Sequence, residues 1–191
     1  MRRSNKERTE SMRLALMAAA RALFVENGYA ETATPEIVSA AGVTRGALYH
    51  HFEDKRALFA AIVAEEARQV GQEIETAAVS KDARQAILAG TRAYFDAMAV
   101  PGRTRLLLLD GPAILGAHRL QVLDAEHSES RLKAGLADLF AASGKSADLL
   151  DAFTELLSAS FDRAALAIEA GASRQDYEKA IATLIDGIFV R

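Results

Sequence analysis

The chain has 191 residues, half of them hydrophobic, and a formal net charge of −3 from 26 acidic and 23 basic side chains. This length accommodates one medium domain or two small ones. The absence of cysteine excludes disulfide bonds, a thiol redox switch and a zinc site built on thiolates. With only three prolines, the apolar content favours an all-α globular protein with a substantial core.

Positive charge is concentrated at the N-terminal end, although the whole chain is acidic. Residues 1–56 hold nine Lys and Arg against seven Asp and Glu, a net charge of +2, whereas residues 57–191 carry −5. We expect residues 1–8 to be a polar, basic and mobile arm, which either touches DNA weakly or is only a solvated end. No stretch approaches the roughly 20 apolar residues of a membrane span. A cytoplasmic location without a membrane partner is therefore expected.

A first helix is expected over residues 9–27, because Gly28 follows it as a helix terminator. Residues 34–56 then read TPEIVSAAGVTRGALYHHFEDKR. This pattern predicts a short helix capped by Thr34, a tight turn at Gly42, a second short helix and the start of a third. Two helices joined by a glycine-containing turn form a helix-turn-helix, whose second helix enters the major groove of DNA.

The start of the second motif helix holds the expected base contacts. Arg45 offers the donor pair that best matches guanine O6 and N7, and Gly46 lets the helix approach the groove closely. Tyr49 follows Arg45 by four residues and lies on the same face. The adjacent histidines of this helix point about 100° apart, which argues against a shared metal ion. The expected DNA-binding residues are Thr34, Thr44, Arg45, Gly46, Tyr49, His50, His51 and Lys55.

Three segments with consistent spacing carry a resemblance to a known family. They are AAxxLFxxxGY from Ala19, TxTPxI from Thr32, and AGVTRGALYHHF from Ala41 with KxxLF from Lys55. Residues 9–59 thereby resemble the DNA-binding domain of the TetR family of bacterial transcription regulators. The resemblance implies that Thr34, Tyr49, His51 and Lys55 hold the DNA backbone. Two of them, Thr34 and Lys55, also begin helices, whose free N–H groups bind phosphate.

The remainder of the chain is expected to be helical as well, giving about nine helices. A three-helix DNA-binding domain over 1–56 would precede a helical ligand-binding and dimerisation domain over 57–191. The run from Leu106 to Leu109 is apolar on every side and is expected to be buried all round. Residues 118–130 are polar and are expected to separate helices. Further helices are expected over about 55–77, 83–99, 131–142, 147–170 and 173–190, with another starting at Pro112.

The regulatory half offers weaker signals for a ligand site. Its apolar candidates would line a pocket, but a plain hydrophobic core explains them equally well. His118, Asp124, Glu126 and His127 form the only cluster of possible metal ligands, and a solvated helix face is the preferred interpretation. No metal or cofactor is expected. The candidate ligand contacts are Phe95, Met98, Leu106, Asp110, Ile114, Arg119 and Phe140.

The last two helices carry more apolar surface than a terminal hairpin needs. Pairing with the same helices of a second chain would form a four-helix bundle, as in TetR-like dimers. Burial within one subunit explains part of the same apolar stripe. The expected interface residues are Phe153, Leu157, Phe161, Ala165, Ile181 and Ile185.

These features predict a homodimeric repressor that a small-molecule effector of unknown identity releases from a palindromic operator. The choice of repressor over activator rests on the family resemblance. The alternative is a DNA-binding regulator without a ligand, controlled by a protein partner or by its abundance, which would lack a usable cavity. The chain is not expected to be an enzyme, because it shows no catalytic triad pattern and no phosphate-binding glycine loop.

Overall fold

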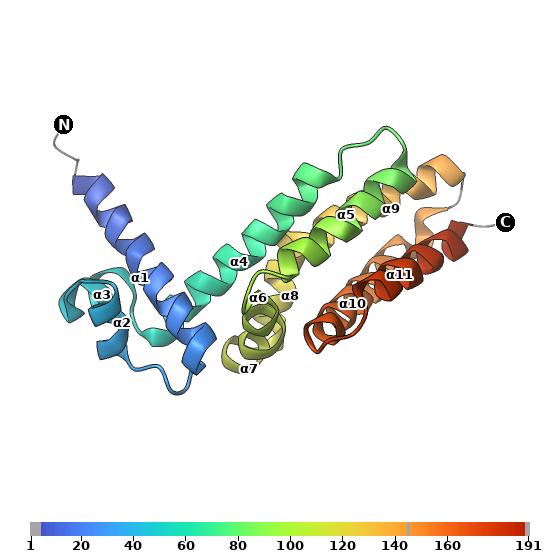
Figure 1. Cartoon of the computed structure of the whole chain (residues 1–191). Coiled ribbons are helices and arrows are strands. Elements are labelled where there is room, and N and C mark those ends of the chain that lie inside the picture. Colours follow the sequence, from blue (N-terminus) through green and yellow to red (C-terminus); the bar gives the residue numbers. More distant parts are fainter. Residues whose placement is uncertain (1–4, 145, 190–191) are drawn as a thin grey trace.

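The computed structural model describes residues 5–144 and 146–189, and this part of the chain is α-helical without any strand (Figure 1). The all-α prediction is confirmed. More than nine helices result because the middle of the chain breaks into short segments. The elements are α1 (Asn5–Asn27), α2 (Thr34–Ala40), α3 (Arg45–His51), α4 (Lys55–Ala77), α5 (Ala83–Met98), α6 (Arg103–Arg105), the π-helical turn η1 (Leu106–Asp110), α7 (Gly111–Leu115), α8 (Ala117–Glu126), α9 (Ser128–Ser143), the 3₁₀ turn η2 (Ala147–Leu149), α10 (Leu150–Glu169) and α11 (Arg174–Phe189).

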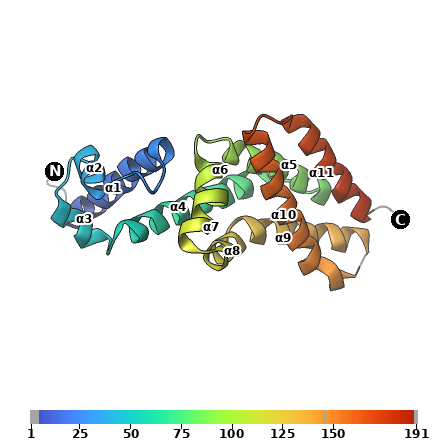
Figure 2. The ribbon, with the colours of Figure 1, turned by 90° about the horizontal axis from the view of Figure 1, so that it is seen from below.

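The helices form two groups that share α4. Helices α1, α2 and α3 cluster at one end of the molecule, and α10 and α11 lie side by side at the other (Figures 1 and 2). Helix α4 contacts α1 in the first group and α5 and α9 in the second. A movement of α4 would therefore change the helix packing in both groups. No helix in the described part of the chain is long and apolar enough to cross a membrane.

Helices α2 and α3 have seven residues each and are too short to be stable alone. Packing on α1 and on each other supplies the missing stability, with Ile37 and Leu48 fully buried. An aromatic cluster supports them, in which the Phe59 ring lies 5.4 Å from Phe24 and 5.0 Å from Tyr29 between centroids. These contacts hold α1 and the connection after it against α4.

The start of the chain differs from the prediction at two points. Helix α1 begins at Asn5, so residues 5–8 are helical rather than a mobile arm, and residues 1–4 lie outside the described residues. The cap of α2 is Ala33 instead of Thr34, which is the first helical residue. The backbone N–H of Ala33 donates to the Glu36 carboxylate at 2.8 Å. The glutamate therefore satisfies the N–H of the cap residue, which is one half of a capping box, while the Ala33 carbonyl accepts from the Glu36 N–H at 3.1 Å.

Residues 118–130 are helical, contrary to the prediction of a polar separator. Helix α8 ends at Glu126 and α9 begins at Ser128, with a sharp turn at His127. Leu120 and Leu123 of α8 pack against the core, whereas Val122 and most of the polar residues of this helix are exposed. Tertiary packing thus stabilises a helix whose own pattern is weak.

The apolar run in the middle of the chain is buried on one side only. Leu106 is 1% exposed, whereas Leu109 is 50% exposed. This run forms the π-helical turn, in which the Gly111 N–H donates to the Leu106 carbonyl. A Cβ atom on Gly111 would lie 2.8 Å from that oxygen, so glycine is required there. Pro112, which has no N–H, follows directly. Turns of this kind are frequent at functional sites.

Candidate functional site

The first turn of α3 presents an exposed face. The Thr44 hydroxyl caps the helix by accepting from the Ala47 N–H at 3.2 Å, as predicted. Arg45, Gly46 and Tyr49 are exposed, and the Arg45 guanidinium carbon lies 5.5 Å from the centroid of the Tyr49 ring. A Cβ atom on Gly46 would meet nothing closer than 3.9 Å. The fold itself therefore does not require glycine at this position.

The other expected DNA contacts surround this face with different exposures. His50 is exposed and His51 is half-buried, with ring centroids 5.4 Å apart. Thr34 is half-buried at the start of α2. Phe52 ends α3 and is buried, which anchors the helix to the core. Asp54 caps α4 through a bond from the Ala57 N–H at 2.6 Å, so its carboxylate is occupied within the protein.

Lys55 faces inward more than the sequence predicts. Its ammonium donates to the backbone carbonyls of Tyr29 at 2.8 Å and Thr32 at 2.9 Å. It also lies 4.3 Å from the centroid of the Tyr29 ring, a cation–π contact. These bonds tie the start of α4 to the connection between α1 and α2. Two of the three ammonium hydrogens are thereby used inside the protein.

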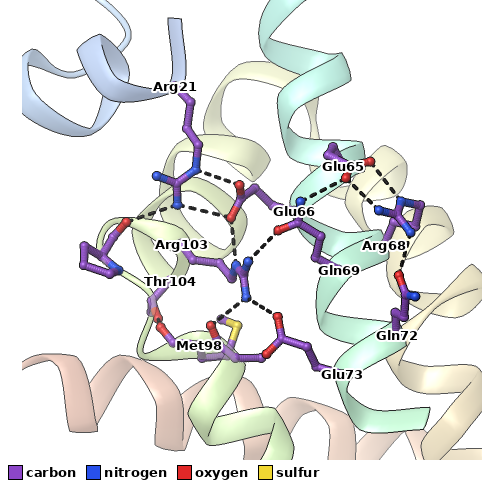
Figure 3. Close-up of polar contacts among 12 residues, drawn as sticks. Arg21, Glu65, Glu66, Arg68, Gln69, Gln72, Glu73, Met98, Arg103 and Thr104 are labelled. Carbon is purple, nitrogen blue, oxygen red and sulfur yellow. Dashed lines mark hydrogen bonds and ion pairs between the residues drawn. The ribbon is translucent and has the colours of Figure 1, made fainter. Parts of the chain in front are cut away.

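A buried ion network joins the two groups of helices (Figure 3). Glu66 on α4 accepts from Arg21 of α1 at 2.7 Å and from Arg103 of α6 at 2.7 Å. Arg103, 3% exposed, also donates to Glu73, Gln69 and the Ala97 carbonyl at 2.8 to 3.1 Å. Burial raises the pKa of Glu66, but the hydrogen bonds from both arginines outweigh it and leave the pKa below its ordinary value. The carboxylate is therefore ionised at neutral pH.

Two further contacts reinforce this connection. Arg21 also donates to the Pro101 carbonyl at 3.1 Å, just before α6. Arg56, at the start of α4, donates to the carbonyls of Ile114 at 3.1 Å and Leu115 at 3.4 Å, which end α7. The helix-turn-helix group is thus fastened to both α6 and α7 through polar contacts.

Two cavities lie in the second group of helices. One, of about 220 Å³, is walled by α4, α5, α8, α9 and α10, with Ile74, Ile87 and Phe161 among its apolar residues. The other, of about 270 Å³, extends toward η1 and α7, with Leu107 and Pro112 in its wall. Both cavities share the same four residues, Tyr94, Asp124, Ser128 and Asp162. None of these four residues is among the ligand contacts predicted from the sequence.

The shared residues carry unusual electrostatics. The Tyr94 hydroxyl donates to Asp162 at 2.8 Å, and the Ser158 hydroxyl donates to Asp124 at 3.0 Å. Burial raises the pKa of Asp162 to about 6, with the Tyr94 hydrogen bond opposing the shift and Asp124 adding to it. Burial also raises the pKa of Asp124, against hydrogen bonds from Ser158 and Ser128. Tyr94 has a pKa well above its ordinary value for the same reason and stays protonated.

The predicted ligand contacts lie mostly elsewhere. Of the seven, Met98 lines the second cavity, and Phe95 and Met98 also line a separate one of about 230 Å³ near Pro101. Leu106 and Phe140 are core residues, and Asp110 forms an ion pair with Arg105 at 3.2 Å. Ile114 and Arg119 are outside the linings of all three cavities. Of the seven ligand contacts predicted from the sequence, Met98 alone lines one of the two central cavities.

The predicted dimer residues mostly face their own subunit. Leu157, Phe161, Ala165, Ile181 and Ile185 are 0 to 7% exposed in the single chain, and Phe153 is half-buried. The exposed leucines of this end are instead Leu149, Leu156 and Leu184, which are 53 to 67% exposed. Within residues 5–144 and 146–189, no group of three His, Asp or Glu side chains is placed to hold a metal ion.

Comparison with known families matches both groups of helices. The model described as bacterial regulatory proteins, tetR family, matches residues 16–62. The model described as tetracyclin repressor-like, C-terminal domain, matches residues 84–189, more than half of the chain. The chain belongs to the TetR family. As a TetR-family protein it is a DNA-binding transcription regulator, and its α2–α3 unit is the family's helix-turn-helix.

Individual TetR-family relatives share the fold more than the sequence. The HTH-type transcriptional repressor BepR of Brucella suis is 46% identical over 63 residues, which span 33% of this chain and 30% of BepR. A TetR-family regulator from Pectobacterium atrosepticum has a TM-score of 0.74 and 26% identity over 99% of both chains. LfrR from Mycobacterium smegmatis, solved with proflavine, has a TM-score of 0.64 and 19% identity over 95% of this chain and 98% of LfrR.

Proposed function

We propose that the chain is a repressor that binds a palindromic operator as a homodimer and leaves it when a small molecule binds. The carrying observation is that the exposed face of α3 belongs to a unit fastened by the buried Glu66 network to the helices that enclose the cavities. Such a function requires residence in the cytoplasm, where bacterial operators lie. BepR is described as a repressor and LfrR was solved with proflavine, so repression and small-molecule binding are each known for a relative of this chain.

The outward face of α10 and α11 is the proposed dimer interface. Leu156 and Leu184 expose more than half of their side-chain surface there. Pairing the two helices with their copies would bury this surface in a four-helix bundle. The two-fold axis would place the recognition helices in successive major grooves, about 34 Å apart. The interface residues predicted from the sequence are mostly buried behind this face and would pack it against the core of the same subunit.

The second cavity provides a route from ligand to DNA. Its wall includes Leu107 of η1 and Pro112 of α7, which continue the chain from Arg103 of α6. A ligand that favours a different position of these segments would shift α6, and with it Glu66 and Arg21. The ligand acts only through its different affinities for the two states. By reciprocity, operator binding must weaken ligand binding by the same factor.

The alternative, a regulator without a ligand, would be favoured by a filled regulatory core. Two cavities of 220 to 270 Å³ weigh against it. Selection of bound sequences from random duplex DNA tests the main proposal. A palindrome with half-sites one helical turn apart is expected. Enrichment of a lone half-site would contradict the dimer, and no enrichment would contradict sequence-specific regulation.

Lys55 is proposed to hold the α1–α2 connection rather than to contact a phosphate. Lys55→Met keeps the aliphatic stem but leaves two carbonyls without their donor, and should lower the free energy of unfolding by about 1–3 kcal/mol. The salt dependence of operator binding should keep its slope. Chemical denaturation and binding titrations measure the two effects, with the exposed Lys81→Met as control. A slope shallower by about one unit would show a direct phosphate contact instead.

A further inference from the structure

Two carboxylates that lie between the cavities have no arginine or lysine partner among the described residues, although His127 lies close enough to Asp124 to lower its pKa. Asp124 of α8 and Asp162 of α10 line both cavities, and each is largely buried. Each accepts a hydrogen bond from a neutral hydroxyl, from Ser158 and Tyr94 respectively. In the described part of the chain, neither forms an ion pair with an arginine or lysine. Burial raises the pKa of both carboxyls above the ordinary value, and the hydroxyl hydrogen bonds offset this only in part.

The surroundings of the pair are apolar and aromatic. Tyr94 is 8% exposed and packs against Phe161, with ring centroids 5.4 Å apart. Apart from the amide of Gln121, the second cavity is lined otherwise by apolar residues of α4, α5, η1, α7, α8 and α10. The basic residue on the wall of the first cavity, Arg131, is already paired with Glu75 at 2.7 Å. A bound molecule would thus meet net negative charge within an apolar enclosure.

We propose that these cavities bind an organic cation, with its ammonium group between Asp124 and Asp162 and its apolar groups in the two cavities. The proposal rests on the ligand-responsive repressor described above and gives its effector a chemical class. A cation supplies the charge partner that the buried carboxylates lack, and the faces of Tyr94 and Phe161 favour it further. An anion would be repelled by the same pair. A neutral molecule would leave the charge uncompensated.

A matched set of three compounds tests the ligand class with the full-length protein. They are 4-phenylbutylamine, 4-phenylbutanol and 4-phenylbutyrate, which share a skeleton and differ in charge at one end. Isothermal titration calorimetry at pH 7.5 should show the amine binding at least ~10-fold more tightly than the alcohol, and no binding of the carboxylate. Displacement of the selected operator should follow the same order.

Two variants locate the binding site. Asp162→Asn and Asp124→Asn keep an oxygen acceptor for their hydroxyl partners, so both should fold, and each should weaken amine binding by ~10-fold or more. Affinity for the alcohol should stay the same. The matched control is Asp148→Asn, which makes the same charge change at an exposed position outside both cavities and should leave amine binding unaltered.

Proton release on amine binding would not be expected if Asp124 and Asp162 only stabilised the fold, so it distinguishes a binding role from a structural one. A bound ammonium favours the ionised carboxyls, so amine binding at pH 6 should release protons. Asp162 faces Tyr94 of α5 and Asp124 of α8, and Asp124 also interacts with His127. The other charged residues of the first cavity are Glu75, Arg131 and Asp138. Calorimetry in buffers of different ionisation enthalpy measures this release. Its absence in the wild type would overturn the proposal.

The outcomes separate this proposal from the repressor itself. If the alcohol or the carboxylate binds as tightly as the amine, or if Asp148→Asn weakens the amine as much as Asp162→Asn, the cation proposal is overturned. If none of the three compounds binds, it is overturned as well. The repressor proposal would still stand in each case if an enriched palindromic operator is obtained, and would fall only without one.

Discussion

Replacing Glu66 by alanine should lower the free energy of unfolding by about 3–5 kcal/mol, because it strands buried charge. The Arg103 guanidinium is 3% exposed and would lose the carboxylate that lies 2.7 Å from it. Arg21 would lose the same partner, and with it the polar contact between α1 and α4. Chemical denaturation followed by circular dichroism measures the loss.

The neighbouring Glu65 provides the matched control. It lies on the same helix and pairs with Arg68 at 2.7 Å, but the Glu65 side chain is 37% exposed and that of Arg68 50%, against 5% for Glu66. Exposed pairs of this kind contribute little to stability, so Glu65→Ala should change the free energy of unfolding far less than Glu66→Ala. Equal losses for the two variants would show that burial does not decide the importance of the network. Glu66→Gln, which keeps the shape and loses the charge, should fall between them.

Asp162 should contribute a loss of about 3 kcal/mol to the free energy of unfolding as pH rises from about 4 to about 6. Its pKa is about 6 in the folded chain and 3.8 as an ordinary aspartate, so the folded state binds the proton more tightly. Protonation therefore favours folding below this window, and ionisation removes the advantage above it. Asp162→Asn should be more stable than the wild type at pH 7 by about the same amount.

The informative quantity is the difference in the free energy of unfolding between wild type and Asp162→Asn, because other carboxyls titrate in the same pH range. Urea denaturation at several pH values should show a gap between Asp162→Asn and wild type that opens between pH 4 and pH 6. Asp148→Asn, at an exposed position, should show no such gap. A variant less stable than wild type at pH 7 would mean that the ionised carboxylate supports the fold. Together with weakened amine binding, the expected result would mark Asp162 as a residue kept for function.

The helix-turn-helix was predictable because its signals are local. Gly42, with a φ of 65°, ends α2, and the caps Thr44 and Asp54 stand directly before the helices they begin. The boundaries of α3 and α4 follow from these residues. The predicted cap of α2 is wrong because the helix begins one residue earlier than Thr34 implies: the cap is Ala33, which has no polar side chain, and its N–H donates to Glu36. Local sequence patterns therefore predict the helix-turn-helix correctly, except for the cap of α2.

The regulatory site was not predictable because its residues are distant in the chain. Tyr94 and Asp162 are 68 residues apart, and Glu66 and Arg103 are 37 apart. Asp124 was noticed only as a possible metal ligand, since its neighbours along α8 are also polar. The apolar stripes of α10 and α11 indicated burial correctly. They did not indicate whether the partner was the same subunit or a second one, and most of the chosen residues face inward.

The most direct test of the central claim, that α3 reads base edges through Arg45, is a comparison of wild type and Arg45→Ala on the operator obtained by selection. Arg45 is exposed at the start of α3, and its loss should leave folding intact. Binding to the operator should weaken by about 1–3 kcal/mol, and preference should relax at one base position in each half-site. Equal weakening on every sequence, with all base preferences kept, would contradict the claim and make Arg45 a backbone contact.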